Sequence, residues 1–267
     1  LEADMNYECL VQGNNPLTPV VIGGVARSGT RIIADILSQH KHFRVEDEMH
    51  AKSIEAYFNF LDTVQANFDH YSERKGRRLD RNWKNNKIFL HHIFLSVGAK
   101  NQTTTPFVKD IHYHAFKTPG HKRYFEQFEK IFSPVKPLYI YAIRDVGAVW
   151  RSWVTREFTN EVDLFKSRYE RSLRQALKIK RNAPGRFALF DLEAYINTEH
   201  QQNFIRRTIL DKLLIEDLVV WPENGIENIN SASALGLELH SDPQLKAEMK
   251  SLQSNEKIQK LLQEVRS

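Results

Sequence analysis

Short apolar runs alternate along the chain with longer segments of helical character. The runs have the length and the β-branched or aromatic content of buried strands, and they span residues 20–24, 106–109, 138–143 and 186–190. Strands of a parallel sheet are apolar throughout because helices cover both faces. The helical segments between the runs are 30–39, 51–66, 120–132, 146–158 and 161–180. This alternation predicts an α/β fold with a central parallel sheet flanked by helices.

The same pattern predicts a single domain. It does not divide into two cores and contains no internal repeat, and 267 residues are enough to bury one large core. The polar, basic stretch 67–87 is expected to be a loop or an excursion from the domain. In the stretch 242–267, apolar residues recur at near-helical spacing. We expect one amphipathic helix there, packed on the body of the domain or, alternatively, on a partner.

Composition narrows the class of protein. Hydrophobic residues make up 41% of the chain and aromatic residues 11%, which is typical of a folded globular domain. The net charge of +5 suits an anionic ligand but is too small to indicate nucleic acid. The basic run 74–78 is expected to be a solvated loop rather than a binding patch.

Cysteine content and hydropathy set further limits. Cys9 is the only cysteine, which excludes an intrachain disulfide and a thiolate metal cluster. No apolar stretch has the length of a membrane span, and the N-terminal residues lack a signal-peptide pattern. We therefore expect a cytoplasmic protein, with a membrane anchor ahead of the first residue left open. The oligomeric state is not predicted.

The most informative segment follows the first apolar run. Residues 20–24 lead into a glycine turn, and a helical segment begins a few residues later. A strand, a glycine-rich turn and a helix N-terminus hold phosphates because backbone N–H groups converge there and the helix dipole favours an anion. Arginines at the turn add charge-assisted donors. The residues that we expect to hold a phosphorylated or sulfated ligand are Arg27, Ser28, Gly29, Thr30 and Arg31.

This loop differs from the ATP-binding loop of the P-loop NTPases. Gly24 and Gly29 have the spacing of the glycines in G-x-x-x-x-G-K-[ST]. Thr30 and Arg31 stand where that motif needs lysine and then a hydroxyl residue, so the hydroxyl that would bind Mg²⁺ is misplaced. Arg27 supplies a cation inside the loop instead. We expect a phosphate site that works without a metal; the alternative is a turn used only for packing.

A second motif follows the run at 138–143. Arg144 ends that strand, and Ser152 lies eight residues further on, within the next helical segment. The arginine offers a planar fork of donors, and the serine hydroxyl can reach another phosphate oxygen. An arginine and a serine at this spacing occur often by chance, so the pair becomes informative only together with the first loop. The alternative for Arg144 is a surface salt bridge, for example with Asp145.

Together the two motifs resemble those of the sulfotransferases that use 3′-phosphoadenosine 5′-phosphosulfate (PAPS). Residues 24–31 are similar to the 5′-phosphosulfate loop, in which a strand is followed by Pro-(Arg/Lys)-Ser-Gly-Thr-Thr. Ala26 replaces the proline, and Arg31 replaces the second threonine by a cation. The spacing of Arg144 and Ser152 matches the 3′-phosphate motif of the same family. The resemblance covers mainly residues 19–50 and 105–155.

The resemblance implies a fold, a reaction and a set of ligands. The fold would be the P-loop-containing, sulfotransferase-like α/β fold. The reaction would transfer a sulfuryl group from PAPS to a hydroxyl acceptor, leaving 3′-phosphoadenosine 5′-phosphate (PAP), without a metal. Arg27 would stabilise charge on the leaving phosphate. The acceptor stays open between a glycan, a peptide tyrosine and a lipid or small-molecule hydroxyl.

Sulfuryl transfer to a hydroxyl needs a general base, and the residues after the first helix contain the candidates. Residues 23–48 resemble the tyrosylprotein sulfotransferases best, which implies that Glu48 is the base. Glu48 and His50 also form the Glu-x-His pattern of some heparan sulfate enzymes, which implies that His50 assists. Asp47 is the second choice. The alternative is that Glu46, Asp47 and Glu48 are a solvated acidic cluster at the start of the next helix.

The run at 106–109 contributes a candidate lysine. Lys109 closes this predicted strand, and many family members have a strand-end lysine within Lys-x-Pro or Lys-x-His. The resemblance implies that Lys109 steadies the sulfuryl group or orients the acceptor; the alternative is a solvated lysine. His112 lies three residues on rather than two, so its position does not support a histidine base. His112 and His114 have the spacing of two metal ligands, but without a third ligand we expect no metal site.

Two other functions are carried as alternatives. A P-loop nucleotide kinase or NTPase would use the run 187–191 as a Walker-B-like strand. A non-catalytic module would bind anionic ligands without turnover. The polar loop 221–233, with Asn228 and Asn230, could close over a nucleotide, although an ordinary turn is the simpler expectation.

Overall fold

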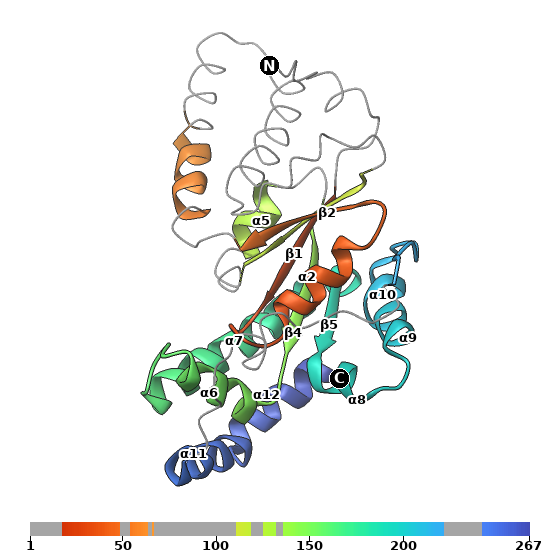
Figure 1. Ribbon diagram of the computed structural model, residues 1–267. Helices are drawn as coiled ribbons and strands as arrows, with labels where there is room; N and C mark the ends of the chain where they lie inside the picture. The colour runs from red at the N-terminus through yellow and green to blue at the C-terminus, as the bar shows by residue number, and fades with distance from the viewer. Residues whose placement is uncertain are drawn as a thin grey trace, which may run out of the picture.

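A computed structural model describes residues 18–48, 54–63, 66, 111–118, 125–131, 136–221 and 242–267 (Figure 1). Residues 54–63 are helical. The other elements, in chain order, are β1 (Thr18–Gly24), α2 (Thr30–Ser38), β2 (Phe43–Glu48), β3 (Tyr113–Lys117), α5 (Phe125–Ile131), β4 (Leu138–Ile143), α6 (Val146–Thr155), α7 (Val162–Asn182), the 3₁₀ turn η2 (Pro184–Arg186), β5 (Phe187–Asp191), α8 (Leu192–Asn197), α9 (Gln201–Ile205), the π-helical turn η3 (Arg206–Leu210), α10 (Asp211–Leu213), α11 (Pro243–Gln253) and α12 (Glu256–Arg266).

Within the described residues, five strands form one sheet in the order β2-β3-β1-β4-β5. Every neighbouring pair is parallel, so the carboxyl ends of all strands lie along one edge. The chain passes from β1 to one side of the sheet and later crosses to β4 on the other side. In open α/β sheets a ligand binds at the carboxyl edge where the strand order reverses. That point is the end of β1.

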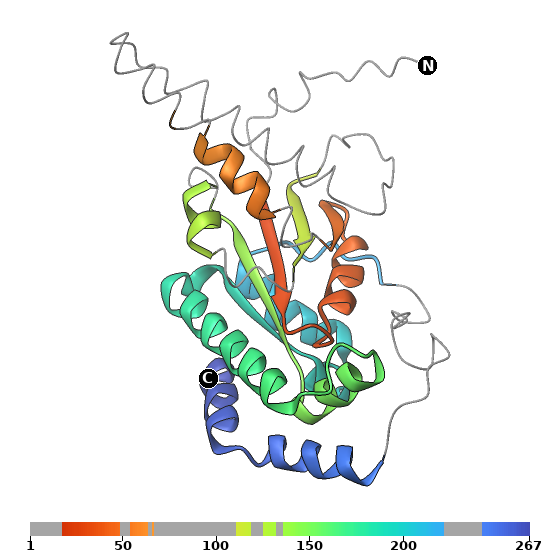
Figure 2. The ribbon, with the colours of Figure 1, turned by 90° about the vertical axis from the view of Figure 1, so that its left-hand side faces the viewer.

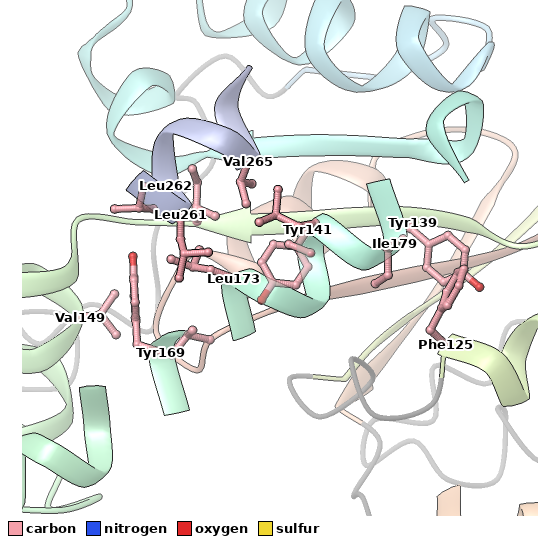
Figure 3. Packing of buried hydrophobic residues seen from close by; sticks show 14 of the residues in the cluster. Phe125, Tyr139, Tyr141, Val149, Tyr169, Leu173, Ile179, Leu261, Leu262 and Val265 are labelled. Carbon is pink, nitrogen blue, oxygen red and sulfur yellow. The ribbon is translucent and has the colours of Figure 1, made fainter. Parts of the chain in front are cut away.

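The sheet is covered on both faces by helices, as its apolar strands require. On one face, alternate residues of β1, β3 and β4 pack with α5, α6, α7, α11 and α12. Figure 3 shows Tyr141 of β4, Leu173 of α7 and Val265 of α12 in this cluster. On the other face, the intervening strand residues pack with α2, η3 and α8–α10. The predicted α/β fold with a central parallel sheet is confirmed.

The strand predictions were confirmed for the apolar strands β1, β4 and β5 but missed β2, the first strand in the sheet order. β1, β4 and β5 lie where the apolar runs predicted them, as do α2, α6 and α7. β2 was not predicted, because its sequence FRVEDE is mostly charged and contains no apolar run. The predicted strand 106–109 lies outside the described residues. The strand that pairs with β1 in this part of the chain is β3, whose bounds are Tyr113–Lys117.

The C-terminal stretch forms two helices rather than the single helix predicted. α11 ends at Gln253, and α12 begins at Glu256 (Figure 2). Asn255 separates them because its side chain accepts a hydrogen bond from the backbone N–H of Ile258, which caps α12. Both helices pack on the domain, α11 against α6 and α12 against α7.

The length and apolar character of the helices decide whether any of them could cross a membrane. In the part of the chain that the structure describes, no helix combines the length and apolar character needed to cross a membrane. The cytoplasmic location stays a prediction.

Candidate functional site

The candidate residues lie along the carboxyl edge of the sheet, in the order of the strands. Glu48 ends β2, and Lys117 ends β3. The glycine loop follows β1 at the centre, and Arg144 follows β4. Because neighbouring strands are parallel and in register, these positions are brought together although they are far apart in sequence.

Two glycines allow the loop after β1 to make its turns. Gly24 has φ of 149°, and a Cβ atom there would overlap the carbonyl oxygen of Ala142 and the hydroxyl of Ser28. Gly29 is the N-cap of α2, with φ of 100°. Arg27 has φ of 76°, the left-handed conformation that non-glycine residues adopt rarely and that often occurs in anion-binding loops. The backbone therefore turns sharply in front of the helix N-terminus.

Three successive carbonyl oxygens of this loop are fixed by hydrogen bonds. Ser28 is buried, and its hydroxyl donates to Val25 O at 2.6 Å. Trp153 Nε1 donates to Ala26 O at 2.8 Å, and Arg144 Nη1 donates to Arg27 O at 3.4 Å. The donors come from the loop itself, from α6 and from the end of β4. The loop is therefore held in one conformation before any ligand binds.

The loop arginine and the α6 serine are in direct contact. Arg27 Nε donates to Ser152 Oγ at 3.0 Å. Burial, followed by the charges of Arg156 and Arg144, lowers the pKa of Arg27. Cationic neighbours close enough to oppose the charge of Arg27 create the positive potential that an anion needs. Arg156 lies one helical turn after Ser152, which explains why it reaches the same place.

Arg144 is engaged by a residue that the sequence analysis did not consider. Its Nε lies 3.5 Å from Glu193 Oε1 in the first turn of α8. Asp145, the expected salt-bridge partner, instead caps α6, with its carboxylate accepting a hydrogen bond from Ala148 N at 2.8 Å. The backbone N–H of Asp145 donates to Glu193 Oε2 at 2.8 Å. Arg144 thus stands between the phosphate loop and α8.

The two remaining loop residues begin α2. Thr30 is the first residue of the helix and is buried. Arg31 is partly exposed, and its Nε pairs with Asp35 Oδ1 at 2.7 Å, four residues along the helix. The contact of Arg31 that the structure specifies is therefore within α2.

A β-bulge aligns the end of β2 with the end of β3. Glu46 is in register with Phe116, but Glu48 rather than Asp47 is in register with Lys117. The irregularity lies between Glu46 and Glu48, so Asp47 is the additional residue. Lys117 is buried and also pairs in register with Ile22 of β1. Glu48 and Lys117 therefore close neighbouring strands beside the phosphate loop.

A buried ionic cluster lies on β2 and β3, a few residues before the carboxyl ends of these strands. Glu46 is 4% exposed, and its Oε1 is 2.5 Å from Arg44 Nε and 3.4 Å from His114 Nε2. Burial favours the protonated carboxyl, but interactions with His114 and Arg44 outweigh it and hold the pKa of Glu46 below its ordinary value. Burial lowers the pKa of His114, which favours the neutral imidazole. The cluster joins β2 to β3.

Some candidates fall outside the described residues. These are His50, Lys109, Asn228 and Asn230, whose roles stay predictions. Of the possible metal ligands, His112 stacks on His42 with ring centroids 4.3 Å apart, whereas His114 lies against Glu46. Among the described residues, no three His, Cys, Asp or Glu side chains come together as a metal site would require.

Comparison with known proteins identifies the family. A model of the sulfotransferase family matches residues 19–203, which include β1, the glycine loop, Arg144 and Ser152. The chain belongs to the sulfotransferase family. No curated protein matches it.

Solved sulfotransferases have a similar structure. The sulfotransferase from Alicyclobacillus acidocaldarius has a TM-score of 0.51 and 12% identity, over 94% of this chain and 96% of that chain. The sulfotransferase domain of the Synechococcus PCC 7002 olefin synthase has a TM-score of 0.49 and 16% identity, over 95% of each chain. At such low identity the first of these similarities supports the sulfotransferase fold alone.

Two residues of this sulfotransferase were missed although the sequence contained a signal for each. Lys117, followed by Thr118 and Pro119, has the Lys-x-Pro pattern, but the strand Tyr113–Lys117 that it closes was not predicted from the sequence. Arg156 follows Ser152 at the i+4 spacing that places two side chains on one helix face. Glu193 had no such signal, because only the fold brings α8 to Arg144.

The Walker-B-like interpretation of β5 is not supported in this sulfotransferase. Asp191 Oδ2 pairs with Arg266 Nε at 2.8 Å, and Asp191 Oδ1 accepts a hydrogen bond from Ala194 N at 3.4 Å. Its carboxylate therefore binds α12 and caps α8. In addition, β4 separates β5 from β1 in the sheet.

Proposed function

We propose that the protein is a PAPS-dependent sulfotransferase that sulfates a hydroxyl group of a carbohydrate or a peptide tyrosine, with a small-molecule acceptor as the other possibility. The observation that carries the proposal is the convergence of Arg27, Arg144 and Ser152 at the carboxyl edge of β1 and β4. A donor nucleotide with phosphate groups at both the 5′ and 3′ positions needs two neighbouring anion sites. The cytoplasmic location predicted from the sequence is part of this proposal.

The positive charges of the site support the binding of the sulfuryl donor, PAPS. Residues 27–31 would hold the 5′-phosphosulfate at the N-terminus of α2, where the helix dipole favours an anion. Arg144 and Ser152 would hold the 3′-phosphate. Burial, together with the charges of Arg156 and Arg144, lowers the pKa of Arg27, and binding of an anion relieves the repulsion among these three arginines. The residues present therefore fit a doubly phosphorylated nucleotide, and no step requires a metal.

The acceptor side is built by β2 and β3. We assign the base to Glu48, with His50 assisting, and the bulge favours Glu48 over Asp47 because it puts Glu48 opposite Lys117. Lys117 takes the role that the sequence analysis gave to Lys109, since it is the lysine that closes β3. A cation there, with Arg27, stabilises negative charge on the leaving phosphate.

The reaction is an in-line displacement at sulfur. The acceptor oxygen forms a bond to sulfur, the bond between sulfur and the oxygen of the 5′-phosphate breaks, and PAP leaves. Glu48 takes the hydroxyl proton. The fixed loop around Arg27 needs no rearrangement at that moment, which is the condition for efficient electrostatic stabilisation.

Radiolabelled PAPS tests this assignment. The purified protein is incubated in EDTA with acceptors that include desulfated glycans, tyrosine peptides and phenols. General-base catalysis contributes about 10²–10⁴-fold, so Glu48→Gln is expected to reduce the transfer rate by about 100-fold or more while PAP affinity changes less than about twofold. Asp47→Asn is the matched control and should retain transfer.

Three other results would contradict the assignment of the base or favour an alternative function. Near-normal transfer by Glu48→Gln would show that Glu48 is not the base. PAP binding by the wild-type protein without transfer to any acceptor would favour the non-catalytic anion-binding module. Hydrolysis of Mg·ATP without PAP binding would favour the nucleotide kinase or NTPase.

A further inference from the structure

A carboxylate lies beside the arginine that the proposed function assigns to the 3′-phosphate. Glu193, in the first turn of α8, places Oε1 3.5 Å from Arg144 Nε. Its other oxygen, Oε2, accepts the backbone N–H of Asp145 at 2.8 Å. One carboxylate therefore contacts both the side chain of Arg144 and the backbone of the next residue.

This carboxylate ends a series of contacts that crosses the candidate nucleotide site. Arg144 Nη1 donates to the carbonyl oxygen of Arg27 at 3.4 Å, and Arg27 Nε donates to Ser152 Oγ at 3.0 Å. The series joins α8, the end of β4, the phosphate loop and α6. Glu193 is thus linked through Arg144 to Arg27 and Ser152.

The neighbouring acidic residue is used elsewhere. Asp191 pairs with Arg266 of α12 at 2.8 Å, so the carboxylate that ends β5 binds the C-terminal helix. Glu193, two residues later, is the one that reaches Arg144. Its side chain is 34% exposed, and burial raises its pKa above the ordinary value, whereas the Asp145 N–H and Arg144 act in the opposite direction.

The charge of Glu193 has two opposing effects on an anion bound at Arg144. A negative charge beside an anion site weakens binding of the anion through Coulomb repulsion. An arginine side chain, however, loses considerable rotamer freedom when it binds a phosphate, and an arginine already held in place loses less. Contact with Nε leaves the terminal nitrogens of the Arg144 guanidinium for the ligand and for the loop carbonyl.

We propose that Glu193 is a positioning residue that orients Arg144 toward the 3′-phosphate, and that it thereby sets the preference for nucleotides phosphorylated at both the 3′ and 5′ positions. The inference rests on the proposed function, because it assigns the 3′-phosphate to Arg144. It adds a residue of α8, which the two phosphate motifs do not include.

Isothermal titration of two nucleotides tests the inference. PAP and 5′-AMP are titrated in EDTA into the wild-type protein, Glu193→Ala, Glu193→Gln and Arg144→Ala. One charge-assisted hydrogen bond between Arg144 and the 3′-phosphate corresponds to about a tenfold change or more in affinity. Glu193→Ala is therefore expected to weaken PAP binding by about tenfold and to leave the affinity for 5′-AMP within about twofold of the wild-type value. Adding Glu193→Ala to Arg144→Ala should cause little further loss, because both act through the same phosphate contact.

Two variants separate orientation from general damage. Glu199→Gln removes the same charge at an exposed position six residues further on and should change neither affinity. Glu193→Gln keeps an acceptor for Asp145 N–H but removes the negative charge beside Arg144, so it should show most of the loss for PAP. It also serves as the test variant if Glu193→Ala does not fold.

Two results would overturn the inference, and a third would overturn the proposed function on which it rests. Unchanged or tighter PAP binding by Glu193→Ala and Glu193→Gln would mean that the carboxylate only repels the ligand. Equal losses for PAP and 5′-AMP would mean that Glu193 supports the fold of the loop rather than the 3′-phosphate contact. Failure of the wild-type protein to bind PAP would overturn the proposed function itself. This result comes from the wild-type titration alone and is therefore distinct from the results for the variants.

Discussion

Two residues of the buried cluster formed by Arg44, Glu46 and His114 make the folding stability depend on pH. The pKa of Glu46 is lowered in the folded protein despite burial, because His114 and Arg44 favour the carboxylate. The pKa of His114 is lowered by burial. Both shifts have the same sign: the unfolded chain binds protons more readily, so acidification destabilises the fold. The contribution of His114 is lost as the pH falls below its ordinary pKa of 6.5, and that of Glu46 below 4.5.

We predict that Glu46→Gln lowers stability most at neutral pH. The loss should be about 1–3 kcal/mol at about pH 7, because the ion pair with Arg44 is removed while the side-chain volume is kept. The difference from the wild-type protein should begin to shrink at about pH 4, because below 4.5 the unfolded carboxyl binds a proton that the folded carboxylate does not. Urea unfolding at the two pH values measures it, with Glu199→Gln as the exposed control. A difference that does not depend on pH would show that Glu46 is not ionised in the fold.

Residues that lie within one local motif could be predicted from the sequence. Arg27, Arg144 and Ser152 were found because each belongs to a strand–turn–helix pattern with recognisable spacing, and the structure brings them together. Glu193 could not be found, because its partner is 49 residues away in sequence and the contact exists only once β4 and β5 are paired. Lys117 was missed because the strand that it closes, Tyr113–Lys117, was not predicted, although the Lys-x-Pro pattern was present.

Among the elements, the loop between β1 and α2 depends most on backbone conformation. Gly24→Ala would bring a Cβ atom into the carbonyl oxygen of Ala142 at a φ of 149°, so we predict a loss of stability of about 1–3 kcal/mol together with weaker PAP binding. Gly185→Ala is the matched control, since a Cβ atom at Gly185 has no atom within 4 Å. Thermal unfolding and PAP titration measure both variants. Equal behaviour of the two would contradict the role of Gly24.

Apolar character decided which elements could be predicted. β4 is buried throughout and β1 is buried after its first residue, and both have neighbours on both sides, so their sequences are apolar runs. β2 lies at the end of the strand order as the structure describes it, and Glu46 on this strand is paired with Arg44 and His114 rather than packed among apolar side chains. Such a strand has no distinctive periodicity, because pairing with β3 is a property of the fold.

For the whole molecule, the C-terminal helices extend the domain beyond the family match, which ends at residue 203. Leu262 of α12 is 3% exposed and belongs to the cluster that includes α6 and α7. We predict that Leu262→Ala lowers the free energy of unfolding by about 2–5 kcal/mol, because it leaves a cavity in this cluster. Lys260→Ala, at an exposed position of the same helix, should have little effect. Thermal unfolding that is unchanged by Leu262→Ala would mean that α12 does not stabilise the domain.

Calorimetric titration of PAP in EDTA tests the central claim, that the loop and the end of β4 form the two phosphate sites of a sulfotransferase. We predict binding at about micromolar affinity without a metal, about tenfold or more weaker binding of 5′-AMP, and loss of that difference in Arg144→Ala. Absence of PAP binding by the folded wild-type protein, or tighter binding of Mg·ATP than of PAP, would contradict the account.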